Sequence, residues 1–258
     1  MKPAIALCVA TEGIAWHFGE RLQRSFEYFH PDIPFILARP EDGVKLFGES
    51  YVRPTMGCQL ISPWCERVWF VKLLKAEYDV VMMFDADVVV TARLDEFLTG
   101  GYDVAGTLNV ERSPGEIFFN MGVTSVGSQR FADVWSEKLV DYNWWHRFGN
   151  EQEILNVLCG NAGHKFHKEK YSVKVADKEG CYYNERSRNY WGEIELRDDN
   201  MFCNGRHLKV MHWAGGTDFE ARYSSAVFSQ EVREHLDKIT GTKDFTSNPG
   251  HDAHWFHR

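Results

Sequence analysis

Short apolar stretches and an amphipathic stretch alternate over the first forty residues of the chain. Residues 4–10 and 34–38 are apolar runs typical of buried strands, and between them Leu22, Phe26 and Phe29 recur at helical spacing. A strand, a helix and a second strand in this order predict a βαβ unit, in which the two strands lie parallel. The beginning of the chain therefore predicts an α/β fold.

The same pattern continues to about residue 240. Strands are expected at residues 80–90, 102–108, 117–126 and 208–212. Helices are expected from Pro63 to Tyr78 with Ser62 as N-cap, after the N-caps Ser128 and Asn150, and at residues 229–240. Residues 40–62 are loop-like, and residues 160–205 are polar and weakly periodic. Because no repeat or linker is evident, we expect a single domain over residues 1–240, followed by a tail at 241–258.

The run at residues 80–90 contains two aspartates, Asp85 and Asp87, among apolar residues. Burying a bare carboxylate costs several kcal/mol unless it is paired or bound to a metal, so we expect both where the strand ends and meets solvent. Residues two apart in a strand point to the same side, and open α/β sheets bind their ligands at the carboxyl ends of strands. The pair therefore indicates a seat for a hard divalent cation. A polar turn after a buried strand is the alternative.

Composition and charge exclude several classes of protein. The formal net charge of −8 disfavours broad, non-specific binding of nucleic acid. The six cysteines form no CxxC pair, which indicates reduced thiols and a cytoplasmic setting. Cysteines and histidines between residues 159 and 207 fit no common zinc spacing. The apolar run at 4–10 is too short for a signal peptide, and no run approaches the 18 or so residues of a membrane span.

Three further groups are candidates for chemistry. His212 ends an apolar strand, where a neutral imidazole is either a third metal ligand or a structural residue. Asn120 lies inside another apolar strand and either binds a ligand hydroxyl or bonds to the backbone. Residues 151–153 (Glu-Gln-Glu) begin a helix, where carboxylates suit the positive end of the helix dipole and can also bind a polyol.

Taken in order, residues 4–216 resemble a GT-A type glycosyltransferase, nearest to family 8, the glycogenin and galactosyltransferase group. The motifs that carry the resemblance are an Asp-x-Asp strand at 84–88, an arginine on the preceding helix at Arg67, an Asn-x-Gly strand at 119–123, a helix start at 150–156 and a histidine followed by glycine at 211–215. Two features depart from the family pattern. Residues 217–222 replace its Lys-Pro-Trp, and Glu151 replaces its aspartate.

The resemblance implies a single Rossmann-like GT-A domain with a mostly parallel central sheet, helices on both faces and a C-terminal extension on the acceptor side. Residues 1–126 would bind the nucleotide sugar and 127–240 the acceptor. The implied residues are Asp85, Asp87 and His212 for Mn²⁺ or Mg²⁺; Ala10, Thr11 and Glu12 for the base and ribose; Asn120, Arg67, Glu151 and Gln152 for the sugar; and Arg222 for the diphosphate. Nitrogen among the metal ligands favours Mn²⁺.

The function expected from the resemblance is transfer of a hexose from a nucleotide-diphosphate sugar, a UDP-sugar in the first place, to an acceptor hydroxyl. If the likeness to family 8 holds, the anomeric configuration is retained and Gln152 lies beneath the anomeric carbon. An inverting enzyme would need a carboxylate base, for which Glu151, Glu153 and Asp218 are available.

Two other functions compete with glycosyl transfer. One is a catalytically inactive protein that binds a nucleotide sugar or a carbohydrate. The other is a sugar-nucleotide nucleotidyltransferase, although residues 11–16 lack its glycine-rich, basic loop. The acceptor is expected to contact residues 160–205, whose tyrosines and tryptophan offer stacking faces for a carbohydrate or another hydroxyl-bearing group. The acidic balance disfavours a nucleic-acid acceptor.

Overall fold

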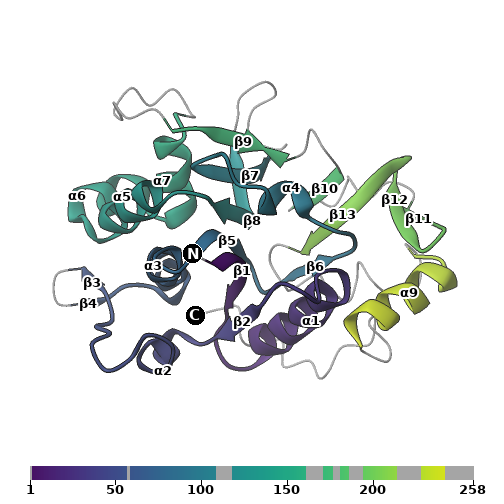
Figure 1. Ribbon diagram of the computed structural model, residues 1–258, viewed down its shortest axis with the longest axis horizontal. Helices are drawn as coiled ribbons and strands as arrows, with labels where there is room; N and C mark the ends of the chain where they lie inside the picture. The colour runs from purple at the N-terminus through teal and green to yellow at the C-terminus, as the bar shows by residue number, and fades with distance from the viewer. Residues whose placement is uncertain are drawn as a thin grey trace.

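A six-stranded sheet forms the centre of the protein (Figure 1). The computed structural model describes residues 2–56, 59–108, 118–160, 171–176, 181–185, 194–213 and 228–241. In spatial order the strands are β2 (Phe35–Ala38), β1 (Lys2–Val9), β5 (Tyr78–Phe84), β8 (Phe119–Val126), β7 (Val104–Leu108) and β9 (Val173–Val175). Strand β8 runs antiparallel to both of its neighbours, and the other three pairings are parallel. The predicted α/β fold with a mostly parallel central sheet is confirmed.

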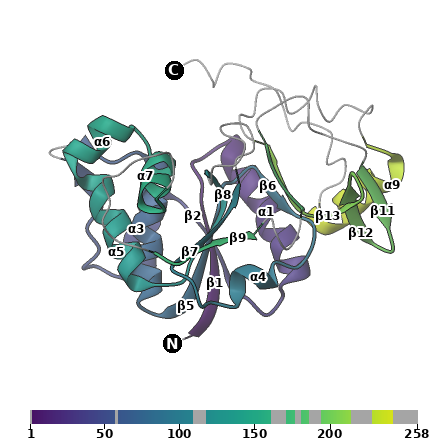
Figure 2. The ribbon, with the colours of Figure 1, turned by 90° about the horizontal axis from the view of Figure 1, so that it is seen from above.

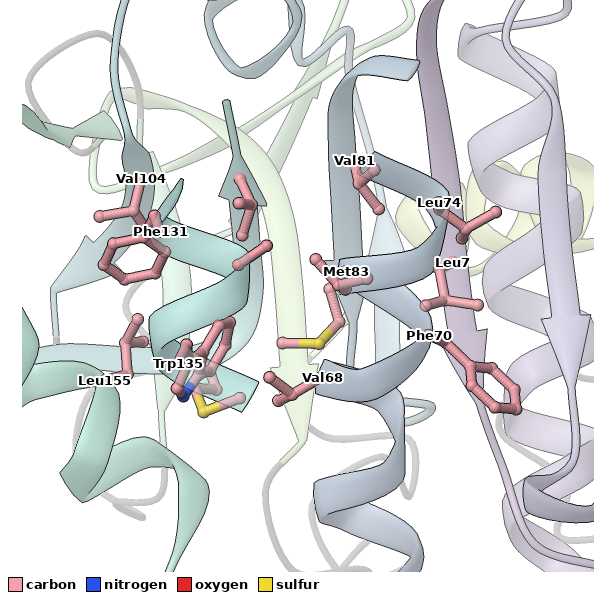
Figure 3. Packing of buried hydrophobic residues seen from close by; sticks show 14 of the residues in the cluster. Leu7, Val68, Phe70, Leu74, Val81, Met83, Val104, Phe131, Trp135 and Leu155 are labelled. Carbon is pink, nitrogen blue, oxygen red and sulfur yellow. The ribbon is translucent and has the colours of Figure 1, made fainter. Parts of the chain in front are cut away.

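Helices cover both faces of this sheet (Figure 2). One face carries α3 (Pro63–Lys75), α5 (Gln129–Val140), α6 (Tyr142–Phe148) and α7 (Glu151–Leu158), and the other carries α1 (Ile14–Phe29) and α4 (Asp95–Leu98). Side chains of β1 alternate between the two faces. Ile5 and Leu7 belong to the core beneath α3, α5 and α7 (Figure 3), and Ala6 and Cys8 belong to the core beneath α1. A strand buried on both faces has to be apolar throughout, which explains the continuous run in the sequence.

The apolar run at 80–90 is shared between two sheets. Strand β5 ends at Phe84, and β6 (Val88–Val90) leaves the central sheet to pair antiparallel with β13 (Arg206–Trp213). The N–H of Asp85 still donates to the carbonyl of Gly122 on β8, at 3.1 Å. Asp85 and Asp87 therefore lie in the crossing between the sheets, at the carboxyl end of β5, where the sequence predicted a strand end.

A smaller sheet extends the fold on one side. It has the order β10 (Cys181–Glu185), β13, β12 (Asn200–Cys203) and β11 (Ile194–Arg197), with β6 on β13. Helix α9 (Gln230–Thr240), capped by Ser229, packs Val232, Leu236 and Ile239 into a third core beside this sheet. The region 160–205 thus contains strands that the weak periodicity did not predict. Among the described helices, none is both long and apolar enough to cross a membrane.

Two other segments differ from the sequence prediction. Residues 40–62 are more regular than a loop and contain a 3₁₀ turn at Pro40–Asp42, helix α2 (Gly43–Phe47), and a hairpin of β3 (Thr55–Met56) and β4 (Gln59–Leu60). Helix α3 ends at Lys75 because Tyr78 already belongs to β5. Helix α6 was not predicted, although its capping residues Asp141 and Gly149 are visible in the sequence.

Candidate metal and sugar site

Two aspartates and one histidine converge where the two sheets meet. Nε2 of His212 lies 3.1 Å from Oδ1 of Asp87 and 3.4 Å from Oδ2 of Asp85. One ligand atom from each residue can be chosen so that all three lie within 4.8 Å of one another. Strand β13 places His212 opposite Val88 of β6, just after the aspartates, so two segments about 125 residues apart meet through strand pairing.

The burial and charge of these three groups suit a divalent cation. The imidazole of His212 is 2% exposed, and the two carboxylates are about a quarter exposed, at 25% and 23%. Burial lowers the pKa of His212, but the facing carboxylates of Asp87 and Asp85 outweigh burial and raise it to about 10. Two carboxylate oxygens and one imidazole nitrogen are a donor set that can hold a divalent cation. The residues therefore fit a divalent cation, and the choice of Mn²⁺ stays a prediction.

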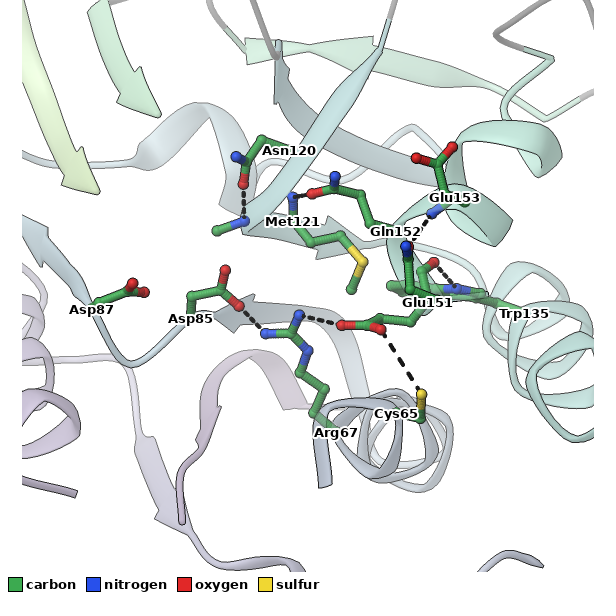
Figure 4. Close-up of polar contacts among 12 residues, drawn as sticks. Cys65, Arg67, Asp85, Asp87, Asn120, Met121, Trp135, Glu151, Gln152 and Glu153 are labelled. Atoms are coloured by element: carbon green, nitrogen blue, oxygen red, sulfur yellow. Dashed lines mark hydrogen bonds and ion pairs between the residues drawn. The ribbon is translucent and has the colours of Figure 1, made fainter. Parts of the chain in front are cut away.

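Arg67 links this cluster to the beginning of α7 (Figure 4). Its guanidinium donates from Nη1 to Oδ1 of Asp85 and from Nη2 to Oε1 of Glu151, the latter at 3.0 Å. The other carboxylate oxygen of Glu151 accepts the thiol of Cys65, with 3.8 Å between Sγ and Oε2. Burial raises the pKa of Asp85, but the positive charges of Arg67 and His212 outweigh it and hold the pKa well below its usual range. Arg67 thus favours the ionised form of Asp85 and orients both carboxylates.

The first turn of α7 faces the first half of β8. Asn150 caps the helix by accepting the N–H of Glu153 at 2.8 Å, so Glu151 and Gln152 project from the helix start. Oε1 of Gln152 accepts the N–H of Met121 at 3.0 Å, and Oδ1 of Asn120 accepts the N–H of Gly122 at 2.7 Å. The structure therefore places Asn120, Gln152 and Glu151 near one another, at the start of α7 and the facing part of β8 (Figure 4), and their role in binding a sugar stays a prediction.

Asn156 is a residue whose role sequence reasoning missed. Its side chain is fully buried, and its amide bonds to both the N–H and the carbonyl of Phe119, at 2.6 and 2.9 Å. Strand β5 pairs only with residues 123–126 of β8, so on this edge side chains of α7 bond to the backbone of Phe119 and Met121 beyond the end of β5. Polar residues one helical turn apart, here Gln152 and Asn156, are the signal that could have predicted this contact.

The predicted nucleotide-binding residues lie at the carboxyl end of β1. Ala10 is buried and donates its N–H to the carbonyl of Ala38 at the end of β2, at 2.9 Å, and Glu12 is exposed. Two residues missed from the sequence lie beside them. Arg39 forms an ion pair with Glu12, with 2.9 Å between Nη1 and Oε1, and its guanidinium lies over the ring of Trp16 at 4.9 Å from the centroid.

Other predictions fall outside the described residues. Arg222 and Asp218, the residues 217–222 that replace the family motif, and the tail beyond residue 241 all lie in undescribed segments. The tyrosines at 182 and 183 lie on β10, where the structure describes the backbone only. The diphosphate contact and the acceptor contacts therefore stay predictions.

The fold is that of the GT-A glycosyltransferases, as a likeness to several solved structures shows. Solved structures that share it include the galactosyltransferase LgtC in complex with donor and acceptor sugar analogues, with a TM-score of 0.52 and 17% sequence identity over 92% of this chain and 95% of that one. The glycosyltransferase GlyE of Streptococcus pneumoniae TIGR4 matches with a TM-score of 0.55 and 16% identity, over 94% of this chain and 61% of its own.

The bifunctional glycosyltransferase WbbM matches with a TM-score of 0.57 and 12% identity, over 95% of this chain and 51% of its own. No family model matches the sequence, and no curated protein matches it either. At these identities the likeness establishes the fold, which agrees with the resemblance found in the sequence motifs.

Proposed function

We propose that this protein is a metal-dependent glycosyltransferase that moves a sugar from a nucleotide-diphosphate sugar, in the first place a UDP-sugar, to an acceptor hydroxyl. One observation carries the proposal: Asp85, Asp87 and His212 converge at the carboxyl end of β5, in a fold that known glycosyltransferases share. In such a reaction the bond between the anomeric carbon and the diphosphate breaks, and a new bond forms to the acceptor oxygen, whose proton is released.

Mn²⁺ held by Asp85, Asp87 and His212 would supply positive charge to the leaving diphosphate. The neighbouring residues Arg67 and Glu151 are held by contacts within the protein. Arg67 fixes Asp85 in position through its Nη1, and its second partner Glu151 lies on α7. The side of the site towards β8 therefore holds polar groups in fixed positions, as binding of a sugar with several hydroxyls requires.

The nucleoside is proposed to bind at the carboxyl ends of β1 and β2. Trp16 and Arg39 offer an aromatic face and a planar cation, and both kinds of group stack on nucleobases. Glu12, paired with Arg39, is exposed and offers a carboxylate for a ribose hydroxyl or a base N–H. The nucleotide would then run from this corner across the end of β1 to the aspartates after β5, the strand paired with β1.

The test is donor hydrolysis in the absence of acceptor. The parent protein is incubated with Mn²⁺ and a panel of UDP-, GDP- and TDP-sugars, and release of the nucleoside diphosphate is measured. We expect slow release from at least one donor, loss of that release with EDTA, and loss in Asp87→Asn. Asp79→Asn is the matched control, because Asp79 is an exposed residue at the start of β5, at the opposite end of the strand from Asp85 and Asp87.

Two outcomes would contradict the proposal. Full activity of Asp87→Asn would show that the metal assignment is wrong. Binding of a nucleotide sugar without turnover for any acceptor offered would favour an inactive binding protein, and calorimetry on the same donor panel would detect it.

The choice between retention and inversion is read from the product by NMR. Retention is proposed, on the basis of the family resemblance.

A further inference from the structure

Strand β8 carries a bulge where it passes the candidate site. In the ladder between β7 and β8, Gly106 lies opposite Thr124. The next residue of β7, Thr107, lies opposite Asn120, so one step on β7 spans four steps on β8, from 124 to 120. Residues 121–123 therefore lie between two pairs of the ladder. A bulge bends its strand and redirects the side chains that it carries, and bulges are common beside active sites.

The bulged segment bonds directly to the candidate metal site. The carbonyl of Gly122 accepts the N–H of Asp85, with 3.1 Å between the two atoms. The N–H of the same glycine is held in turn by Oδ1 of Asn120, at 2.7 Å. The backbone of Asp85 therefore lies where the bulge places it, and the direction of its carboxylate depends on the position of residues 120–122.

Gly106, the last residue of β7 before the bulge, lies against a buried aromatic ring. A Cβ at position 106 would lie 2.8 Å from Cδ1 and 2.9 Å from Cγ of Phe119, whereas ordinary contacts of a Cβ are 3.4–4 Å long. The ring is fully buried, and the amide of Asn156 binds both the N–H and the carbonyl of Phe119, at 2.6 and 2.9 Å. A side chain at position 106 would therefore push Phe119, and the residues that follow it, away from β7.

We propose that Gly106 is a positioning residue of the metal site, because its missing side chain lets Phe119 pack against β7 and thereby fixes the bulge that holds Asp85. The inference rests on the metal site of the proposed function. It adds a residue that lies outside the motifs carrying the family resemblance. Groups that orient a metal ligand from behind change metal affinity about 10–100-fold when they are altered, so the consequence is measurable as binding of the cation itself.

Two substitutions change this contact from its two sides. Gly106→Ala adds the Cβ that collides with Phe119, and Phe119→Leu removes the ring while keeping an apolar side chain in the core. The matched control is Gly19→Ala, where the added Cβ would lie 2.6 Å from Cδ1 of Leu37, so that a similar clash falls between α1 and β2. Each single variant, the double variant Gly106→Ala/Phe119→Leu and the parent are titrated with Mn²⁺ alone, and the free ion is followed by electron paramagnetic resonance.

We expect Gly106→Ala to weaken binding of Mn²⁺ about tenfold and Phe119→Leu about threefold, because either change shifts the bulge that orients Asp85. The double variant should bind within about twofold of Phe119→Leu, since the smaller side chain leaves room for the added methyl group, whereas two independent defects would multiply. Gly19→Ala should match the parent. Thermal unfolding shows which variants keep the fold.

Three results would overturn the inference. One is binding of Mn²⁺ by folded Gly106→Ala as tight as by the parent, and another is a loss in the double variant equal to the product of the two single losses. If Gly106→Ala does not fold, Phe119→Leu decides, and unchanged binding by that variant is the third. All three leave the proposed function standing. If the parent binds no Mn²⁺, or if Asp87→Asn binds it equally well, the proposed metal site fails and the inference fails with it.

Discussion

The replacement Arg67→Met gives a quantitative test of how the site is held together. The Arg67 side chain is 6% exposed and pairs with Asp85, which is 25% exposed, and with Glu151, which is 12% exposed. Removing one partner of a buried ion pair costs about 3–5 kcal/mol, because the remaining charge stays desolvated. Since Asp85 keeps some contact with water, we expect a loss of about 3 kcal/mol in the free energy of unfolding at pH 7.

The pH dependence of this loss separates charge from packing. In the parent, Arg67 and His212 hold the pKa of Asp85 below its unfolded value despite burial, so the stability that Asp85 contributes is present above about pH 4 and lost below it. In the variant, the burial of Asp85 is opposed by one positive charge fewer, so its pKa rises and its carboxylate takes up a proton more readily as the pH falls. The difference between parent and variant should therefore shrink to about 1–2 kcal/mol at pH 4.5.

Urea unfolding followed by circular dichroism in EDTA measures both values. The control is Arg197→Met, which removes an exposed ion pair with Glu195 and should cost less than about 1 kcal/mol. A loss for Arg67→Met no larger than that of the control would refute the reasoning. So would a loss that is the same at pH 7 and pH 4.5, because a packing defect alone does not titrate.

Two further predictions concern parts of the chain outside the metal cluster. Burial, helped by the positive charge of Arg93, lowers the pKa of His30 to about 4, and its Nε2 accepts the N–H of Leu94 at 2.9 Å. Because the folded pKa lies below the unfolded one, stability should fall by about 1–2 kcal/mol between pH 7 and pH 5 in urea unfolding; an equal fall in His30→Gln would contradict this. Arg39→Ala should weaken binding of UDP about tenfold in calorimetry, with Trp16 left uncovered; unchanged binding would place the base elsewhere.

The fold was largely predictable because each central strand is apolar along its whole length. Residues 4–10 and 80–84 are buried on both faces of the sheet. A strand buried in this way reads as a continuous apolar run in the sequence, so these strands could be predicted from the sequence alone. The carboxylates that interrupt the second run mark the point where the chain leaves the sheet. The small sheet was missed because its strands are short and of mixed polarity, so that its existence depends on pairing with β13 and not on local periodicity.

The candidate site was predictable in its members but not in its contacts. Asp85, Asp87 and His212 were found from their positions at strand ends, and the structure brings them together. What the sequence could not show is which atoms are already engaged. The ion pair between Arg67 and Glu151 and the bond from Met121 to Gln152 join residues far apart in the chain, and each depends on how α3, α7 and β8 pack. The orientation of an amide follows only from such packing.

The most direct test of the central claim is the position of the metal in a crystal grown with Mn²⁺ and UDP. The anomalous scattering of manganese locates the ion independently of any assumption about its ligands. We predict a single strong peak bound by Asp85, Asp87 and Nε2 of His212, with oxygens of the diphosphate completing its coordination. A diphosphate bound elsewhere, or a manganese peak that lacks these three residues, would contradict the account.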